Sequence, residues 1–179
     1  MARPKSGRGS FRRPGGNSER EERDYDQEII AVDRVTRVMA GGKRMRFRVC
    51  VVIGKLQGHS VGLGVAKGTD VTGAVSKAVA QAKKHMVEVP LNRETIPYPL
   101  EIKYKGAHIL LKPAPLGTGV KVGGSVRTIL KLAKVPNVVG KILGSSNKIS
   151  NARATVAAFH QLHRIPVPQA AEKPVAAGA

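Results

Sequence analysis

Glycine-rich segments are the first candidates for chemistry, because glycine lets a backbone approach a phosphate closely. Two segments have this character, residues 62–68 and residues 117–123. In each, the glycine spacing is one residue longer than the dinucleotide-binding pattern GxGxxG, and no Gly-Lys-Ser or Gly-Lys-Thr follows, as a P-loop requires. We therefore expect no nucleotide site. The first segment is expected to admit a packed helix, with a nucleic-acid backbone as the alternative.

Histidine, cysteine and serine give no complete catalytic or metal-binding set. His160 and His163 lie one helical turn apart, but no cysteine, third histidine or neighbouring carboxylate completes a set of metal ligands. Cys50 stands among valines, where we expect a buried, unreactive thiol. As the single cysteine it excludes an internal disulfide and fits a reducing, cytoplasmic location. The nucleophile motif GxSxG is absent, so we predict no enzymatic activity, no metal and no cofactor.

The chain is a polycation, with 31 Lys and Arg against 12 Asp and Glu and a formal net charge of +19. Such a protein repels itself, so a polyanionic partner is expected, with nucleic acid first. No membrane association is expected, because no run of about 18 apolar residues occurs. Three Phe, three Tyr and no Trp are too few for a base-stacking surface. Contacts to backbone phosphates and 2′-hydroxyl groups are therefore favoured.

Basic residues gather around the glycine pair Gly41-Gly42, where we expect a hairpin tip. The glycines would expose backbone N–H groups and the neighbouring cations would pair with phosphate, which suits contact with an RNA backbone. A tight turn explains the glycines alone, but not the cations. The cluster consists of Arg34, Arg37, Lys43, Arg44, Arg46 and Arg48.

The run Gly144-Ser145-Ser146-Asn147 is the second candidate site, because a predicted helix follows it. Hydroxyl groups and free amides at the positive end of the helix dipole could hold an anion there. Plain capping of the helix explains the same residues equally well. The other residues predicted to bind RNA are Lys67, Lys77, Lys84, Lys121, Arg127, Lys148 and Arg153.

The apolar pattern predicts an α+β fold of two domains. The first, residues 29–92, has three antiparallel strands and one helix with Thr69 as its N-cap. Its second strand is expected to be half-buried, with a cationic outer side that begins at Arg44, Arg46 and Arg48. The second, residues 93–164, has a β-hairpin followed by a helix, a strand and a last helix. A basic, then acidic arm (residues 1–28) and a Pro- and Ala-rich tail (residues 165–179) are expected to be disordered.

The sequence resembles ribosomal protein five of the bacterial small subunit over residues 29–163. The likeness rests on four segments: GKRMRFRVCVVIGKLQGHSVGLGVAKG (42–68), GTGVKVGG (117–124), VPNVVGKILGSSN (135–147) and ARAT (152–155). It implies a first domain like a double-stranded-RNA-binding domain and a second domain with a left-handed βαβ crossover, against the usual handedness.

The resemblance also implies a function and partners. It implies binding to small-subunit ribosomal RNA where head and body meet, contact with ribosomal proteins four and eight, a place near the messenger RNA entry channel, and an influence on decoding accuracy. The chain departs from the family at Lys55-Leu56-Gln57, where Asp or Asn followed by Gly-Asn is usual. It departs again at Lys148, which replaces a common proline.

The sequence leaves two other functions open. In the ribosomal protein family that the sequence resembles, the second domain has the same fold as kinases of the galactokinase and mevalonate kinase type. The segment GTGVKVGGS (117–125) only weakly resembles the phosphate loop of those kinases. ATP binding would favour that alternative. A free RNA chaperone is the other, and it would not sediment with small ribosomal subunits.

Overall fold

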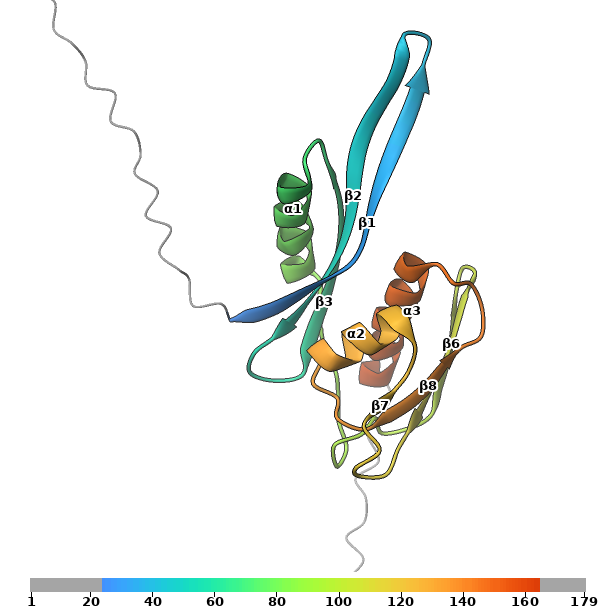
Figure 1. Ribbon diagram of the computed structural model, residues 1–179. Helices are drawn as coiled ribbons and strands as arrows, with labels where there is room; N and C mark the ends of the chain where they lie inside the picture. Colours follow the sequence, from blue (N-terminus) through green and yellow to red (C-terminus); the bar gives the residue numbers. More distant parts are fainter. Residues whose placement is uncertain (1–23, 165–179) are drawn as a thin grey trace, which may run out of the picture.

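The computed structural model describes residues 24–164 and contains two α+β units (Figure 1). Residues 1–23 of the expected arm and the whole expected tail, 165–179, lie outside the described residues. The elements in chain order are β1 (Tyr25–Met39), β2 (Gly42–Lys55), β3 (Ser60–Gly68), α1 (Val71–Lys84), β4 (Met86–Glu88), β5 (Leu100–Tyr104), β6 (Ala107–Pro113), β7 (Val120–Lys121), α2 (Gly124–Leu132), β8 (Val138–Ile142) and α3 (Lys148–Arg164).

The first unit is an antiparallel sheet in the order β1-β2-β3-β4, with α1 against one face. The predicted three strands and helix are confirmed, but three details of the prediction were wrong. β1 begins at Tyr25 rather than Ile29, because Tyr25–Glu28 pair with Val52–Lys55 of β2 instead of belonging to a disordered arm. The short strand β4, which pairs with β3, was not predicted.

The third difference is at the start of α1, where the N-cap is Asp70 rather than Thr69. Asp70 has extended backbone angles, and its carbonyl oxygen accepts the first helical hydrogen bond, from the N–H of Ala74 at 3.1 Å. Its carboxylate accepts a hydrogen bond from the Thr72 hydroxyl. This hydrogen bond is the main cause that lowers the pKa of Asp70.

Close packing of α1 explains the glycines of β3. Ala74, Ala78 and Ala82 of the helix are fully buried in one cluster with Val49, Val51 and Ile53 of β2. A Cβ atom placed on Gly64 would lie 1.9 Å from the carbonyl oxygen of Ala78, so only glycine allows this approach. The prediction that a helix fills this space is confirmed.

The other face of the same sheet is covered by the second unit. Cys50 and Val52 of β2 are fully buried, so the expected cationic outer side of this strand is limited to Arg44–Arg48. A Cβ atom on Gly54 would lie 2.3 Å from the carbonyl oxygen of Leu132 at the end of α2. Val52 shares a core cluster with the apolar side chains of α2 and α3, so this core extends across both units, separate from the core under α1.

Two polar contacts strengthen this junction between the units. The Nδ1 atom of His59, in the β2–β3 loop, lies 3.2 Å from the carbonyl oxygen of Ala133. The Lys134 ammonium group donates a hydrogen bond to the carbonyl oxygen of Leu56. The loop Lys55-Leu56-Gln57, which departs from the family pattern, therefore lies against the end of α2.

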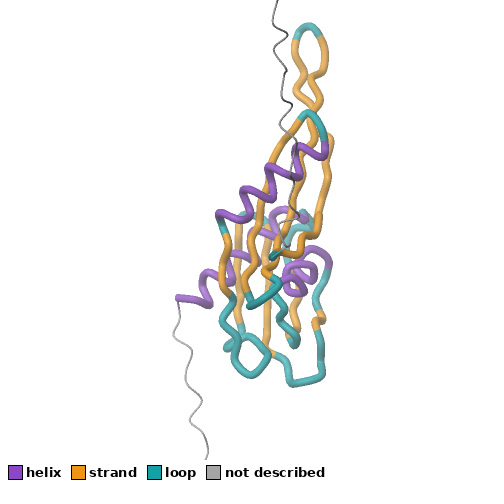
Figure 2. The backbone as a smooth tube through the Cα atoms, turned by 90° about the vertical axis from the view of Figure 1, so that its left-hand side faces the viewer, coloured by secondary structure: helices purple, strands orange, loops and turns teal. Residues whose placement is uncertain are grey.

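The second unit is a mixed sheet in the order β5-β6-β8-β7, with β7 and β8 parallel and the other pairs antiparallel. The predicted order of hairpin, helix, strand and helix is confirmed; β7 forms within the expected glycine-rich loop. β7, α2 and β8 make a parallel crossover, whose left-handedness stays a prediction. Figures 1 and 2 show the layers: α1, the first sheet, α2 with α3, and the second sheet.

A long hairpin projects from the first sheet. β3 pairs with β2 only as far as Phe47, opposite Gly68, whereas β1 and β2 stay paired to Met39 and Gly42. Beyond Phe47 the two strands form a ribbon with no third strand, which rises above the rest of the molecule in Figure 1. Its base is continuous with the buried part of β2.

Replacing Gly64 with Ala tests the packing of α1. Its methyl group would overlap the backbone of α1, so G64A should lower the free energy of unfolding by about 1–3 kcal/mol in a urea titration. Gly73→Ala is the matched control, because nothing lies within 4 Å of its Cβ position. G73A should raise stability by up to about 1 kcal/mol through helix propensity. Equal stability of G64A and wild type would contradict the packing.

Candidate nucleic-acid interface

The projecting hairpin carries cations on both of its faces. Residues directly opposite in an antiparallel ladder share a face. Arg37 pairs with Arg44 and Val35 with Arg46, which places all three arginines on the face that continues into Cys50 and Val52. By the same register, the face toward α1 holds Arg34, Lys43 and the exposed Met45.

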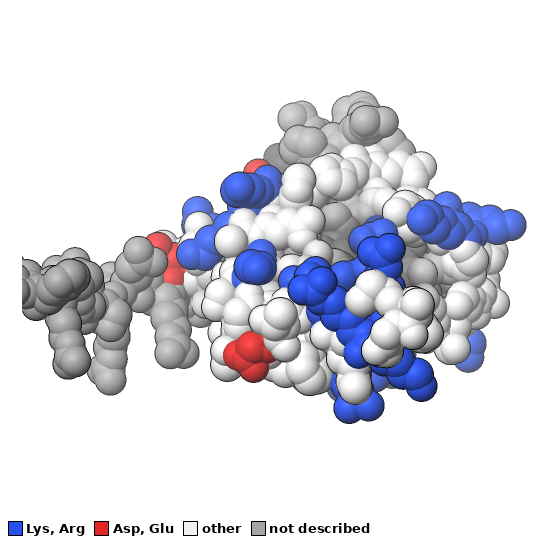
Figure 3. Space-filling view, turned by 90° about the horizontal axis from the view of Figure 1, so that it is seen from above, with Lys and Arg blue, Asp and Glu red and all other residues white. Residues whose placement is uncertain are grey.

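A shallow hollow lies among the cations of the first of these faces. Its volume is about 290 Å³, and its lining includes no carboxylate. Seen down the hairpin, Lys and Arg side chains crowd together on this end of the molecule, with few acidic side chains among them (Figure 3). Four cations with no counter-charge between them can receive phosphate groups. The lining consists of Val35, Thr36, Arg37, Met39, Arg44, Arg46 and Lys67.

Arg48 differs from the other predicted arginines because it already has a partner. Its Nη2 atom lies 2.8 Å from Oδ2 of Asp33, the residue opposite on β1, and its Nε lies 3.3 Å from the same oxygen. The pair fixes the base of the hairpin and offsets the charge of Arg48. Sequence reasoning missed Asp33, although Asp33 and Arg48 are equally distant from the turn at Ala40-Gly41.

Asn147 caps the start of α3. Its Oδ1 atom accepts hydrogen bonds from the backbone N–H groups of Ile149 at 3.0 Å and Ser150 at 3.4 Å. The Ser145 hydroxyl accepts the N–H of Asn147 at 3.2 Å, and its carbonyl oxygen accepts the Asn151 side-chain amide at 2.9 Å. All four residues from Ser145 to Lys148 are exposed, and Ser145 and Asn147 among them act in capping.

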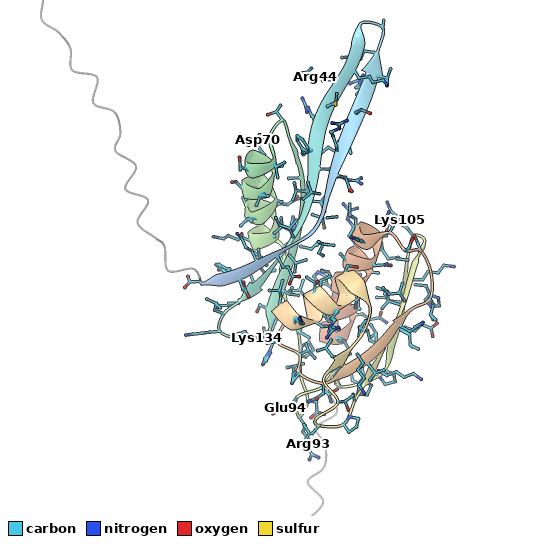
Figure 4. The ribbon with its side chains drawn as sticks, in the orientation of Figure 1. Arg44, Asp70, Arg93, Glu94, Lys105 and Lys134 are labelled. Atoms are coloured by element: carbon cyan, nitrogen blue, oxygen red, sulfur yellow. The ribbon has the colours of Figure 1, made fainter. Side chains whose placement is uncertain are left out.

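This turn lies on the same end of the molecule as the hairpin. The N–H of Ser145 donates to the carbonyl oxygen of Gly106 in the β5–β6 turn at 2.9 Å. The neighbouring Lys105 marks that turn in Figure 4, at the end of the second unit that faces the hairpin with Arg44. The two candidate sites thus lie toward the same end of the molecule, one on each unit.

Cys50 lies where the hairpin base meets α3. The thiol is fully buried, as expected, and burial raises its pKa to about 11. Arg153 of α3 and Arg48 of β2 act on the pKa in the opposite direction. Arg153 lines a hollow of about 270 Å³ together with Leu63 and Val65 of β3, and Val65 is the partner of Cys50. The structure thus places Arg153 beside the sheet, near the strand that continues into the hairpin.

The remaining predicted cations lie elsewhere. Lys77 and Lys84 are exposed on α1, which covers the opposite face of the first sheet. Lys121 lies on β7 and Arg127 on α2, in the second unit. The predicted residues therefore form one surface at the hairpin end and several separate positions.

Within residues 24–164, no three side chains of His, Cys, Asp or Glu come together in a way that could hold a metal ion. Among the helices of the same stretch, none is long and apolar enough to cross a membrane.

Comparison with known families agrees with the geometry. The family model described as "Ribosomal protein S5, N-terminal domain" matches residues 25–90, and that described as "Ribosomal protein S5, C-terminal domain" matches residues 102–173. The chain belongs to the ribosomal protein S5 family. This confirms the family resemblance inferred from the sequence segments.

Curated relatives of this S5 family member match over most of their length. Small ribosomal subunit protein uS5 of Trichormus variabilis is 44% identical over 155 residues, which cover 86% of this chain and 88% of the relative. Small ribosomal subunit protein uS5c of Porphyra purpurea is 45% identical over 152 residues, covering 84% and 87%. The uS5c protein of Pyropia yezoensis is 48% identical over 139 residues, covering 77% and 79%.

Substitutions at the start of α3 separate capping from RNA contact in this S5 family member. Asn147→Ala should lower the free energy of unfolding by about 1 kcal/mol without RNA, whereas Asn147→Ser should retain most of it. Ser146→Ala is the control and should leave stability unchanged, because Ser146 is exposed. The measurement is urea unfolding of the free protein. If N147A and S146A were equally stable, the capping role would be wrong.

Proposed function

We propose that the chain is a structural component of the small ribosomal subunit that binds its ribosomal RNA and catalyses no reaction. Family membership supports the ribosomal role, because the relatives carry the name of small-subunit proteins. The observation that carries the RNA-binding role is the hollow on the hairpin, where Arg37, Arg44, Arg46 and Lys67 meet with no carboxylate in the lining.

The hairpin holds these cations in place before RNA arrives. Its strands are the outer halves of β1 and β2, whose inner halves are paired and buried in the sheet. Because cations lie on both faces of the ribbon, it can contact two RNA segments that pass on either side. Bidentate guanidinium groups suit phosphate, and displacement of counterions supplies most of the driving force.

The start of α3 adds a second contact on the same end of the molecule. Ser146 and Lys148 are exposed there, while Asn147 keeps the helix end ordered. A hydroxyl group beside an ammonium group can bind a phosphate or a 2′-hydroxyl group. Arg153, five residues after Lys148 on α3, is exposed beside Leu63 and Val65 of β3 and adds a cation between this contact and the first sheet.

The finer placement rests on the family resemblance. We propose contact with the ribosomal RNA where head and body of the small subunit meet, neighbours that include ribosomal proteins four and eight, a position near messenger RNA, and support of accurate decoding in cytoplasmic ribosomes. The apolar tip of the hairpin suits a crowded assembly of this kind, because Val38 is 69% exposed and Met39 is 49% exposed.

The hairpin variant Arg44→Gln/Arg46→Gln tests the RNA contact. The affinity of the full chain for a small-subunit ribosomal RNA transcript should fall steeply with salt, and this variant should reduce the slope of log K against log salt by about 1.5. Lys55→Gln/Lys131→Gln removes the same charge from exposed positions away from the hairpin and should keep the wild-type slope.

Two results would count against the proposal. A wild-type affinity independent of salt would exclude phosphate contacts altogether. An equal slope for the hairpin variant and its control would exclude the hairpin as their location. Sedimentation of the cellular protein with small subunits tests the ribosomal role separately.

A further inference from the structure

The outer face of the second sheet carries four lysines. α2 and α3 cover its inner face, where Ile109, Leu111 and Val138 are buried. Side chains alternate along each strand, so the residues between these point to the outer face. The outer face therefore holds one lysine from each strand: Lys103 of β5, Lys112 of β6, Lys121 of β7 and Lys141 of β8.

Three of these lysines surround one exposed valine. Val139 pairs with Lys112 on one side and with Lys121 on the other, and Lys141 follows two residues later on the same strand. Neighbouring strands lie about 4.8 Å apart, so the Cα atoms of Lys112 and Lys121 are roughly 10 Å apart. All three side chains are exposed. Their backbone positions form a compact triangle around Val139.

Within residues 24–164, these lysines have no acidic partner. The single acid of the outer face, Glu101, is already engaged, because its Oε1 atom lies 2.6 Å from Nε2 of His108. The described salt bridges involve neither Lys112 nor Lys121 nor Lys141. The three lysines thus repel one another, and an anionic partner would offset this repulsion.

The edge of the sheet beside the triangle is hollowed. β7 has only two residues, so β8 lacks a partner strand on that side beyond Val139. A hollow of about 330 Å³ lies there, lined in part by Lys121, Lys141 and Gly123. Gly119 N–H donates to Oδ1 of the buried Asn137 at 3.1 Å, which holds the chain leading into β7. The backbone that carries these lysines is therefore held in place.

We propose that this outer face binds a second RNA segment through its phosphate backbone. The inference rests on the proposed RNA-binding function and adds a separate surface to it. RNA is favoured because three lysines without counter-charge surround a small apolar centre. The paired positions of this face hold no Phe, Tyr or Trp, and the imidazole of His108 is engaged with Glu101, so phosphate contact rather than base stacking is the expected mode of binding.

The new surface and the hairpin cannot be parts of one contact. In Figure 1 the hairpin rises at one end, while β7 and β8 lie toward the other end, beyond the layer of α2 and α3. The chain would therefore hold two RNA segments at a fixed separation. This also gives a role to Lys121, which the structure separates from the other predicted cations.

A bridging assay with the full chain tests this inference. Two short RNA duplexes, one with a donor dye and one with an acceptor, are mixed with the protein at low salt and energy transfer between them is measured. Wild type should bring the duplexes together. Lys112→Gln/Lys141→Gln should lose the transfer yet still bind one duplex, while Lys55→Gln/Lys131→Gln should behave as wild type.

The outcomes separate the two proposals. Undiminished transfer with K112Q/K141Q would overturn the second surface and leave the hairpin function standing. Absence of any RNA binding by wild type would overturn both. A poly-glutamate peptide is the probe for an acidic protein partner. If it bound wild type but not K112Q/K141Q, while RNA bridging persisted in that variant, the face would be a protein-binding surface and the inference would be wrong.

Discussion

Burial of β2 on both faces is the constraint on which the rest of the structure depends. Val49, Val51 and Ile53 pack under α1, while Cys50 and Val52 pack toward the second unit. Full burial of one such valine or isoleucine side chain contributes about 1.5–3 kcal/mol. Because alternate residues of one strand serve two cores, neither unit can move away without exposing the other face of the strand.

This constraint explains how a strongly cationic chain can present its charge in fixed positions. Outside the sheet, the same strand carries Arg44 and Arg46 on a ribbon with little apolar cover. The ribbon is held at its base by the sheet and by the Arg48–Asp33 pair. Burial in the central layers thus stabilises the fold. The exposed cations repel one another, and binding of RNA would relieve this repulsion.

Sequence periodicity predicted the elements well where the pattern was long. Alternation over 44–53 and helical spacing after Thr69 gave the main strand and α1, and the position of the glycine pair gave the hairpin tip. The continuous apolar run from Val49 to Ile53 is typical of a strand buried on both faces. The alternating arginines before it dominate the pattern, which therefore predicted a half-buried strand. β4 and β7 are too short to produce any periodicity.

The sites were predictable in residue type but not in arrangement. Clustered cations around Gly41-Gly42 indicated the hairpin contact, and Asn147 before a helix indicated a cap. Placement of Lys121 beside Lys112 and Lys141 depends on β8 lying between β6 and β7, a pairing between distant segments that local patterns do not encode. The position of Arg153 beside Leu63 and Val65 of β3 likewise depends on the packing between the units.

In the proposed function, the hairpin and the start of α3 both contact the ribosomal RNA. RNA cleavage by a tethered iron chelate tests it directly. The native thiol of Cys50 is buried, with a raised pKa, and should not be labelled. Gly41→Cys and Ser146→Cys place an accessible thiol at each contact, since nothing lies within 4 Å of the Gly41 Cβ position and Ser146 is exposed.

Bound to small-subunit ribosomal RNA, both labelled variants should cut the RNA, and wild type treated in the same way should not. Cleavage from only one of the two positions, or from neither, would contradict the account.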